Sequence, residues 1–305
     1  LLMEDLSEVV ARLADSGEYA LPLTAAALLM TLGLAIKSAQ FPFHTWLPDA
    51  HANATTSASA IHSGIVVKGY IILLVKLIVR VFGRDVLVSF YIHELLFLLG
   101  LAGMLFTSVA ALRQEEVKRM VAYSTAAQIS YIFLALGLGS RAGTAAACFQ
   151  VLAHAVTKPM IFVGTGALIR AGRGGHHWSD LRGTAWKDPM AGLAFTVGGL
   201  SLCGLPLLAG FSAKYSLAVA ALTVQWQTLP ALFGLAASAV LNAMYYIPAV
   251  LAIWSRPLKG WQRPPKMPGG MEHKAVIVCF LALNVAVGVG VGPLMELIYQ
   301  GLDLL

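Results

Sequence analysis

The sequence predicts an all-α membrane protein, a polytopic bundle of about eight transmembrane helices. Hydrophobic residues make up 58% of the 305 residues and charged residues only 12%, whereas a soluble domain is typically about 25% charged. The mean hydropathy is +0.76, and apolar stretches of roughly 20 residues, each long enough to cross a bilayer about 30 Å thick, recur along the chain. Backbone groups in lipid must find partners within their own segment, so these stretches are expected to be helices.

The apolar stretches fix the expected spans and the connectors between them. The spans lie near residues 20–38, 57–80, 87–112, 117–138, 143–170, 190–222, 230–254 and 274–298. Residues 1–19 are expected to form an extramembrane loop or an amphipathic segment, and the connector 41–56 is expected to hold a short second helical piece of the first span. Because the chain begins at Leu1, we expect it to be the later part of a longer polypeptide.

The charge pattern gives an expected orientation. The short loops on one side carry twelve Lys and Arg residues, among them Arg113, Lys118, Arg170 and Lys187, and those on the other side carry four. The positive-inside rule therefore predicts that the C-terminus and the segment before the first span lie outside, in a bacterial or archaeal cytoplasmic membrane. The net charge of +6 does not indicate nucleic-acid binding, because the basic residues fall between the spans.

Two expected spans contain helix-breaking residues next to a lysine. Lys37 ends the first apolar run, and Pro42 follows shortly after it. The sixth stretch has the same character, with Gly204, Pro206 and Gly210 just before Lys214. A proline removes a backbone hydrogen bond, and broken backbone at membrane depth is tolerated where protein or water satisfies it. Because an ammonium in hydrocarbon is expensive, these lysines indicate an ion pathway.

Other polar groups are expected inside three more spans. His62 and Lys68 lie in the second span, six residues apart and so on different faces of a helix. In the fifth span, Gln150, His154 and Lys158 follow one another at intervals of four residues and form one polar stripe. Imidazoles exchange protons near neutral pH, and lysines removed from water can do so too. The alternative is a structural histidine and a lysine fixed by one buried acid.

The fourth span and the cysteines are less informative. Ser124 and Gln128 are helical neighbours that could support a file of water molecules or could form interhelical hydrogen bonds, and the sequence leaves both open. Cys148, Cys203 and Cys279 lie in apolar runs without metal-ligand spacing, so we expect reduced core thiols and no metal site. The chain carries no redox or nucleotide motif, so any iron–sulfur or other redox cofactor is expected in partner subunits.

Four ordered motifs resemble one family of membrane proteins. The run KSAQFPFHTWLPDA from Lys37 is followed by VKRMVAYSTAAQISYIFLALG from Val117, HAVTKPMIFVGTGALI from His154 and GLPLLAGFSAK from Gly204. Together they are similar to the antiporter-like subunits of respiratory complex I, Mrp-type cation/proton antiporters and energy-converting membrane hydrogenases. The resemblance covers essentially the whole chain.

The resemblance implies a fold and residue roles. The family has fourteen core helices with two inverted five-helix repeats; residues 20–80 would end the first repeat, 87–254 would form the second, and 274–305 would hold the final helix and C-terminus. The matching relay positions are Lys37 in the broken seventh helix, His62 and Lys68 in the eighth, His154 and Lys158 in the eleventh, and Lys214 in the broken twelfth. Gln150 departs from members that carry a second histidine there, which favours bridging water.

The implied function is proton translocation, with Na⁺/H⁺ exchange left open, in a complex with other hydrophobic subunits. The acidic partner that the family places opposite Lys37 would lie on an upstream segment outside this sequence. Two rival classes remain at this point: a stand-alone secondary solute transporter, and a structural subunit whose buried charges no longer act.

Overall fold

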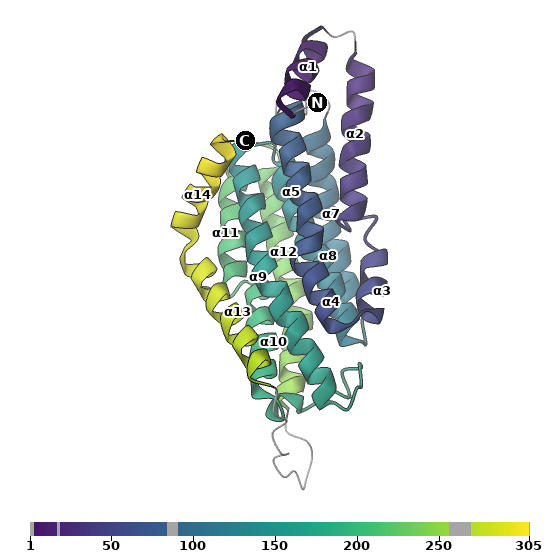
Figure 1. The fold of residues 1–305 in the computed structure, drawn as a ribbon, viewed down its shortest axis with the longest axis vertical. Helices are drawn as coiled ribbons and strands as arrows, with labels where there is room; N and C mark the ends of the chain where they lie inside the picture. Colours follow the sequence, from purple (N-terminus) through teal and green to yellow (C-terminus); the bar gives the residue numbers. More distant parts are fainter. Residues whose placement is uncertain (1–2, 17–18, 84–90, 256–269, 305) are drawn as a thin grey trace.

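The computed structural model describes residues 3–16, 19–83, 91–255 and 270–304, and these residues form helices without a β-sheet. Six of the helices are long and apolar enough to cross a membrane: α2 (Ala20–Lys37), α7 (Ile92–Leu112), α8 (Val117–Gly137), α9 (Arg141–Ala171), α12 (Thr228–Trp254) and α13 (Met271–Val289). They run roughly side by side along the long axis of the molecule (Figure 1). The described chain is therefore an all-α membrane bundle, as the sequence predicts.

The other two expected spans are helical but divided. Residues 56–82 form a run of α4 (Thr56–Ile61), the π-helical segment η1 (His62–Val66), α5 (Val67–Lys76) and a second π-helical segment, η2 (Leu77–Phe82). The sixth span consists of α10 (Pro189–Cys203) and α11 (Ala209–Ala221), separated by a break. The sequence does not predict the π segments, which are rare and frequently mark functional sites.

Both predicted helix breaks are present. After α2, residues 38–45 form a turn that contains Pro42, and the short helix α3 (Trp46–Asn53) continues the span. In the second break Gly204 has a φ of 101°, a left-handed conformation that favours glycine. Pro206 lies exposed in this break. Gly210 instead lies inside α11, where an added Cβ would overlap the carbonyl oxygen of Ser201. Its role is therefore close packing of the two helix halves, and the prediction that it breaks the helix is wrong.

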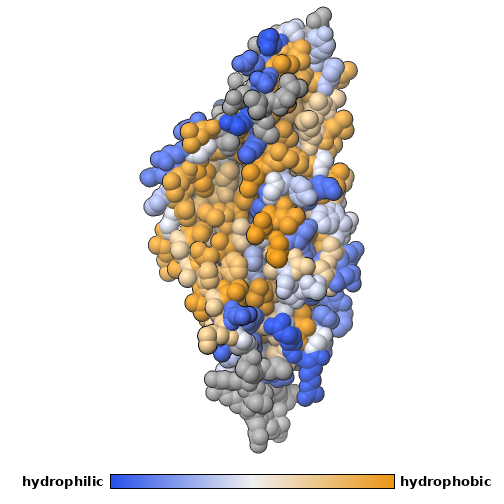
Figure 2. Space-filling view, in the orientation of Figure 1, coloured by the Kyte–Doolittle hydropathy of each residue, from blue (hydrophilic) through white to orange (hydrophobic). Residues whose placement is uncertain are grey.

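The central helices are α8 and α9, and the others surround them. Val117–Gly137 is almost completely buried, whereas α2 and α13 keep most of their surface exposed. Glycines allow the close approach of α7 to α8, because a Cβ on Gly100 would overlap the backbone of Leu134. Figure 2 shows that hydrophobic side chains cover the middle of one face of the bundle and that hydrophilic ones gather toward its ends. The polar residues inside α8 and α9 are thus enclosed by protein.

The first and last parts of the chain lie against the outside of the bundle. The helix α1 (Met3–Ser16) contacts α2 and η2. At the other end, the expected span 274–298 is wrong in its limits, because the chain turns at Gly290 and continues as a separate helix, α14 (Val291–Asp303). None of the side chains of α14 is buried, and Arg141 on α9 forms an ion pair with Asp303. The C-terminal helix therefore lies along the surface (Figure 1).

Two smaller expectations are also corrected. Cys148 and Cys203 are half-buried free thiols, but Cys279 is exposed on α13 and is not a core residue. Lys118, which the charge pattern places in a loop, is buried and donates hydrogen bonds to the carbonyl oxygens of Ala52 (3.3 Å) and Ala54 (2.6 Å). It thereby caps the C-terminal end of α3 and holds this half of the broken helix against α8. The proline-rich segment 256–269 falls outside the described residues.

Candidate functional site

Lys158 lies at the centre of the candidate site. It is fully buried on α9, and its ammonium nitrogen donates to the carbonyl oxygen of Val121 at 2.9 Å and to the hydroxyl oxygen of Ser124. The hydroxyl oxygen of Tyr246 lies 3.4 Å from the same nitrogen, and 2.7 Å from that of Ser124. Within the described ranges no carboxylate contacts Lys158. Its partners are neutral oxygens on α8 and α12.

The predicted polar stripe of α9 faces α8. Gln150 donates from Nε2 to Oε1 of Gln128 at 3.0 Å, two helical turns from the contact of Lys158 with Ser124. His154 lies between these contacts along α9 and is 1% exposed. Neither of its ring nitrogens has a hydrogen-bond partner among the described residues. An unpaired buried imidazole is costly, so this position requires a polar companion such as water.

A path of backbone carbonyl and hydroxyl groups lies between Lys68 and Lys158. Lys68 is 3% exposed, and its nitrogen donates to the carbonyl oxygen of Ser63 in η1. The hydroxyl oxygen of Ser63 lies 3.2 Å from that of Thr125, and Thr125 donates to the carbonyl oxygen of Val121 at 3.1 Å. Because Val121 also accepts from Lys158, these contacts form one connected path.

Irregular backbone on two helices allows this approach. A Cβ on Gly64 in η1 would come within 2.5 Å of the ring of Pro159, the residue after Lys158. Glycine is therefore needed in η1 for the π-helical segment to lie directly against α9. Lys158 then reaches Val121 and Ser124 on α8, while Lys68 bonds to the backbone of η1, where the hydroxyl group of Ser63 contacts Thr125 on α8.

Lys214 occupies a similar place at the second break. It is half-buried on α11, and its nitrogen donates to the carbonyl oxygen of Leu202, near the end of α10. The nitrogen also lies 5.6 Å from the centre of the Tyr131 ring, within the range of a cation–π interaction. The last carbonyl groups of a helix have no intrahelical partner. The break thus provides the acceptor for the lysine.

A second set of contacts extends from the Lys214 position to α12. The amide nitrogen of Asn242 donates to the carbonyl oxygen of Leu202 at 3.2 Å, and its amide oxygen accepts a hydrogen bond from Tyr245. The ring of Tyr245 packs against that of Tyr246, with 4.9 Å between the ring centres. The described residues therefore hold a polar thread, by which we mean Lys68, Ser63, Thr125, Val121, Lys158, Ser124, Tyr246, Tyr245, Asn242, Leu202 and Lys214.

Among the described residues, the side chains of His62 and Lys37 form no hydrogen bond with this thread. His62 is half-buried, and its ring centre lies 5.4 Å from that of the buried His51 and 5.8 Å from that of Trp46. Lys37, at the end of α2, is exposed, and none of the described residues pairs with it. The expectation that the acidic partner of Lys37 lies on a segment outside this sequence stays a prediction.

The sequence does not single out Ser63, His51, Asn242, Tyr245 or Tyr246. A signal was present for Asn242, which is a strongly polar residue inside the 27-residue apolar helix α12, and such residues usually bond across helices. The tyrosines carry no such signal, because tyrosine is also common at membrane interfaces. The partner of Tyr246, Ser124, also lies 122 residues away along the chain.

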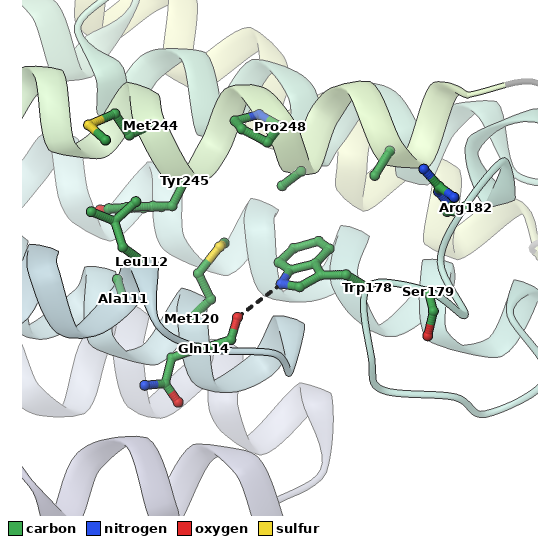
Figure 3. Close-up of a pocket in the computed structure, with 12 residues that line it drawn as sticks. Ala111, Leu112, Gln114, Met120, Trp178, Ser179, Arg182, Met244, Tyr245 and Pro248 are labelled. Carbon is green, nitrogen blue, oxygen red and sulfur yellow. Dashed lines mark hydrogen bonds between the residues drawn. The ribbon is translucent and has the colours of Figure 1, made fainter.

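A cavity of about 470 Å³ lies beside the thread, between α12 and the loops that contain Gln114 and Trp178 (Figure 3). The indole nitrogen of Trp178 donates to the carbonyl oxygen of Gln114 at 3.2 Å, which holds the two loops together. The cavity touches the thread at Tyr245, and its lining includes none of the relay residues expected from the sequence. The candidate site is thus the buried thread and not this cavity.

The chain is similar to curated quinone oxidoreductase subunits. It is 37% identical over 218 residues to the chloroplastic NAD(P)H-quinone oxidoreductase subunit 5 of Lemna minor, and 35% identical over 219 residues to that of Ranunculus macranthus. Each match covers 69% of this chain, and 28% and 29% of the respective relative. The chain therefore spans less than a third of the length of these relatives.

Three solved structures share the fold. An archaeal membrane-bound sulfane sulfur reductase has a TM-score of 0.77 and 30% identity, over 91% of this chain and 55% of the other. Respiratory complex I of Thermus thermophilus has a TM-score of 0.70 and 31% identity, over 90% and 59%. The Mrp complex of Dietzia sp. DQ12-45-1b has a TM-score of 0.82 at 24% identity, over 92% and 59%, which shows the fold alone. All three are membrane complexes.

The family model described as "NADH:quinone oxidoreductase/Mrp antiporter, TM" matches residues 3–240. This range contains α1 to α11 and the three lysines of the thread, and it confirms the resemblance that the four sequence motifs indicate. The comparisons give no support to a stand-alone solute transporter. The chain is a member of the NADH:quinone oxidoreductase/Mrp antiporter transmembrane family.

Proposed function

We propose that this chain is a proton-conducting part of an antiporter-like subunit in a multisubunit, energy-converting membrane complex. The observation that carries the proposal is the complete burial of Lys158 among neutral oxygens in the centre of a membrane bundle. Ionisable groups inside membrane proteins are expensive and usually functional. A lysine without a carboxylate partner in the described structure is suited to exchange its proton.

Protons would move between the lysines through hydroxyl groups and water. From the side of Lys68, the hydroxyls of Ser63 and Thr125 lead toward Lys158. A hydroxyl can accept one proton while it releases another. Lys68 and Thr125 contact backbone carbonyl groups, which carry no exchangeable proton, so water would complete the route between these hydroxyls and the lysines. Like charges at low dielectric repel one another, and a proton that arrives at Lys158 would therefore favour release at Lys214.

His154 is proposed as an intermediate donor and acceptor. Its imidazole is buried on the same face of α9 as Lys158, and its nitrogens are free of protein partners in the described chain. Gln128 also has an unpaired amide nitrogen nearby along α8. Bridging water would satisfy these groups, which agrees with the prediction that Gln150, in place of a second histidine, calls for water. Ser124 serves here as a direct partner of Lys158, while Gln128 and Gln150 support the water file.

Lys37 is proposed to face an acidic residue on another segment. The lysine is exposed at the end of α2, and α2 itself is mostly uncovered. The edge of the bundle near α3 also carries hydrophilic side chains (Figure 2). An exposed ammonium in the membrane needs a protein or aqueous environment. The upstream half that the family resemblance places here would supply that environment.

The proposal is tested in the intact complex, purified in mild detergent and reconstituted into liposomes. Co-purifying redox subunits would identify a redox-driven host, whereas small hydrophobic antiporter subunits would identify an Mrp-type exchanger. Proton uptake is then compared for Lys158→Ala, Lys68→Ala and a control, Lys76→Ala, whose half-buried side chain lies outside the thread. We expect the first two variants to lose proton translocation and the control to retain it. Normal uptake by Lys158→Ala would overturn the proposal.

A further inference from the structure

Asn242 lies on α12 and forms hydrogen bonds to two other helices, α8 and α10. It is fully buried, and its amide nitrogen donates to the carbonyl oxygen of Leu202 on α10 (3.2 Å) and to the hydroxyl oxygen of Tyr131 on α8 (3.5 Å). Its amide oxygen accepts from Tyr245 on its own helix. A carboxamide has two N–H donors, and both have an acceptor here. Hydrogen bonds to both the amide nitrogen and the amide oxygen therefore fix the orientation of the Asn242 side chain.

The two acceptors of Asn242 are the two groups that hold Lys214. The ammonium nitrogen of Lys214 donates to the carbonyl oxygen of Leu202 and lies 5.6 Å from the centre of the Tyr131 ring. The carbonyl group of Leu202 is available because α10 ends at Cys203. Asn242 thus sets the positions of both contacts of the lysine without touching the lysine itself.

We propose that Asn242 is a positioning residue for Lys214, which keeps the Leu202 carbonyl group and the Tyr131 ring aligned with the lysine while its proton is taken up and released. When Lys214 moves away, the Leu202 carbonyl oxygen keeps the hydrogen bond from Asn242 and is not left unpaired in the membrane. The break then remains in one conformation in both states of the lysine. This inference rests on the proposed function, in which Lys214 carries a proton.

Tyr245 connects the same residue to the centre of the site. Its hydroxyl group donates to Asn242, and its ring packs against that of Tyr246, which contacts Ser124 and Lys158. On α12, Asn242 therefore contacts the groups that hold Lys214, and Tyr246 contacts Lys158. A proton does not readily pass through a carboxamide, so Asn242 acts on the geometry of the Lys214 position and is not itself a relay group.

A merely structural role is the alternative, because Asn242 also links α10 to α12. A matched control is available at the other end of the same pair of helices, where the indole nitrogen of Trp254 donates to the hydroxyl oxygen of Thr196 at 3.0 Å. Thr196→Val removes one hydrogen bond between α10 and α12 but touches no residue of the thread. Both variants are to be made in the full chain and assembled in its complex.

The measurements are the amount of assembled complex, its thermal midpoint, and proton uptake in liposomes. We expect Asn242→Leu to lower proton uptake on the order of tenfold, which corresponds to the free energy of about one buried hydrogen bond. Proton uptake by Thr196→Val should stay near that of the parent chain. Tyr245→Phe, which frees the amide of Asn242, should cause a smaller loss. The double variant Asn242→Leu/Tyr245→Phe should be no worse than Asn242→Leu alone, because both act through one group.

Three results would overturn the inference. The first is normal uptake by Asn242→Leu while Lys214→Met abolishes uptake, which leaves the proposed function standing. The second is a fall in proton uptake by Asn242→Leu/Tyr245→Phe that equals the product of the falls in the two single variants. The third is that the complex with Asn242→Leu fails to assemble, while Tyr245→Phe shows the same proton uptake as the control Thr196→Val. If Lys158→Ala and Lys214→Met both translocate normally, the proposed function itself has failed.

Discussion

Replacement of Lys158 by methionine separates the function of this lysine from its contribution to stability. Methionine has a similar unbranched shape but no charge. All groups that bond to Lys158 keep other partners, because Val121 still accepts from the hydroxyl groups of Ser124 and Thr125, and Ser124 still contacts Tyr246. The substitution therefore leaves no buried acceptor unpaired.

The expected change in stability follows from two opposing terms. Removal of a lysine from the centre of a membrane helix relieves about 3 kcal/mol on insertion scales. The lost charge-assisted hydrogen bond to Val121 or Ser124 contributes about 1.5–3 kcal/mol. The terms offset one another to within ~2 kcal/mol, so Lys158→Met should assemble and unfold much like the parent chain.

Proton uptake should respond very differently, because methionine cannot carry a proton. The assay compares proton uptake of reconstituted complexes with their thermal midpoints in detergent, for Lys158→Met and for the control Lys76→Met. We expect uptake to be lost in the first and kept in the second, with both midpoints near the parent value. A large fall in the midpoint of Lys158→Met would show instead that the lysine is a structural clamp. Retained uptake would refute its role in the relay.

Three further changes test other parts of the site. Thr125→Val removes the hydroxyl group that links Ser63 to the Lys158 position, and should lower proton uptake on the order of fivefold with little effect on the thermal midpoint; unchanged uptake would exclude this route. Gly210→Ala should destabilise the assembled complex by a few kcal/mol, measured by thermal unfolding, because the methyl group would overlap the Ser201 carbonyl oxygen. Lys118→Met should free the end of α3, which limited proteolysis would detect as new cleavage near residues 50–55; an unchanged pattern would contradict the capping role.

The predicted helices and breaks follow from local features of the sequence, and the structure confirms most of them. The apolar length of α9 and the spacing of Gln150, His154 and Lys158 are enough to place these side chains on one helix face. Gly204 and Pro206 mark the second break for equally local reasons, since a φ of 101° suits glycine. The sequence does not predict the turn at Gly290, because a single glycine within an apolar run is also compatible with a continuous span.

The partners of the lysines could not be predicted in the same way. They include backbone carbonyl groups such as those of Val121 and Leu202, which every residue possesses and which no motif distinguishes. The π-helical segment at His62 depends on how Gly64 packs against Pro159, a contact between residues distant in sequence. The sequence therefore indicates which side chains are candidates for proton exchange, and the tertiary packing decides what each of them contacts.

The choice of partner has a consequence for proton exchange. Lys68, Lys158 and Lys214 each donate to a backbone carbonyl group, and in the described residues none of them contacts a carboxylate. A carboxylate would favour the ammonium strongly and hold its proton, whereas a carbonyl oxygen is neutral and can accept from an amine as well as from an ammonium. Irregular backbone, in η1 and at the end of α10, supplies two of these acceptors. Helix irregularities in this bundle thus provide sites that bind a lysine without fixing its charge, which is the property that a chain of exchangeable protons requires.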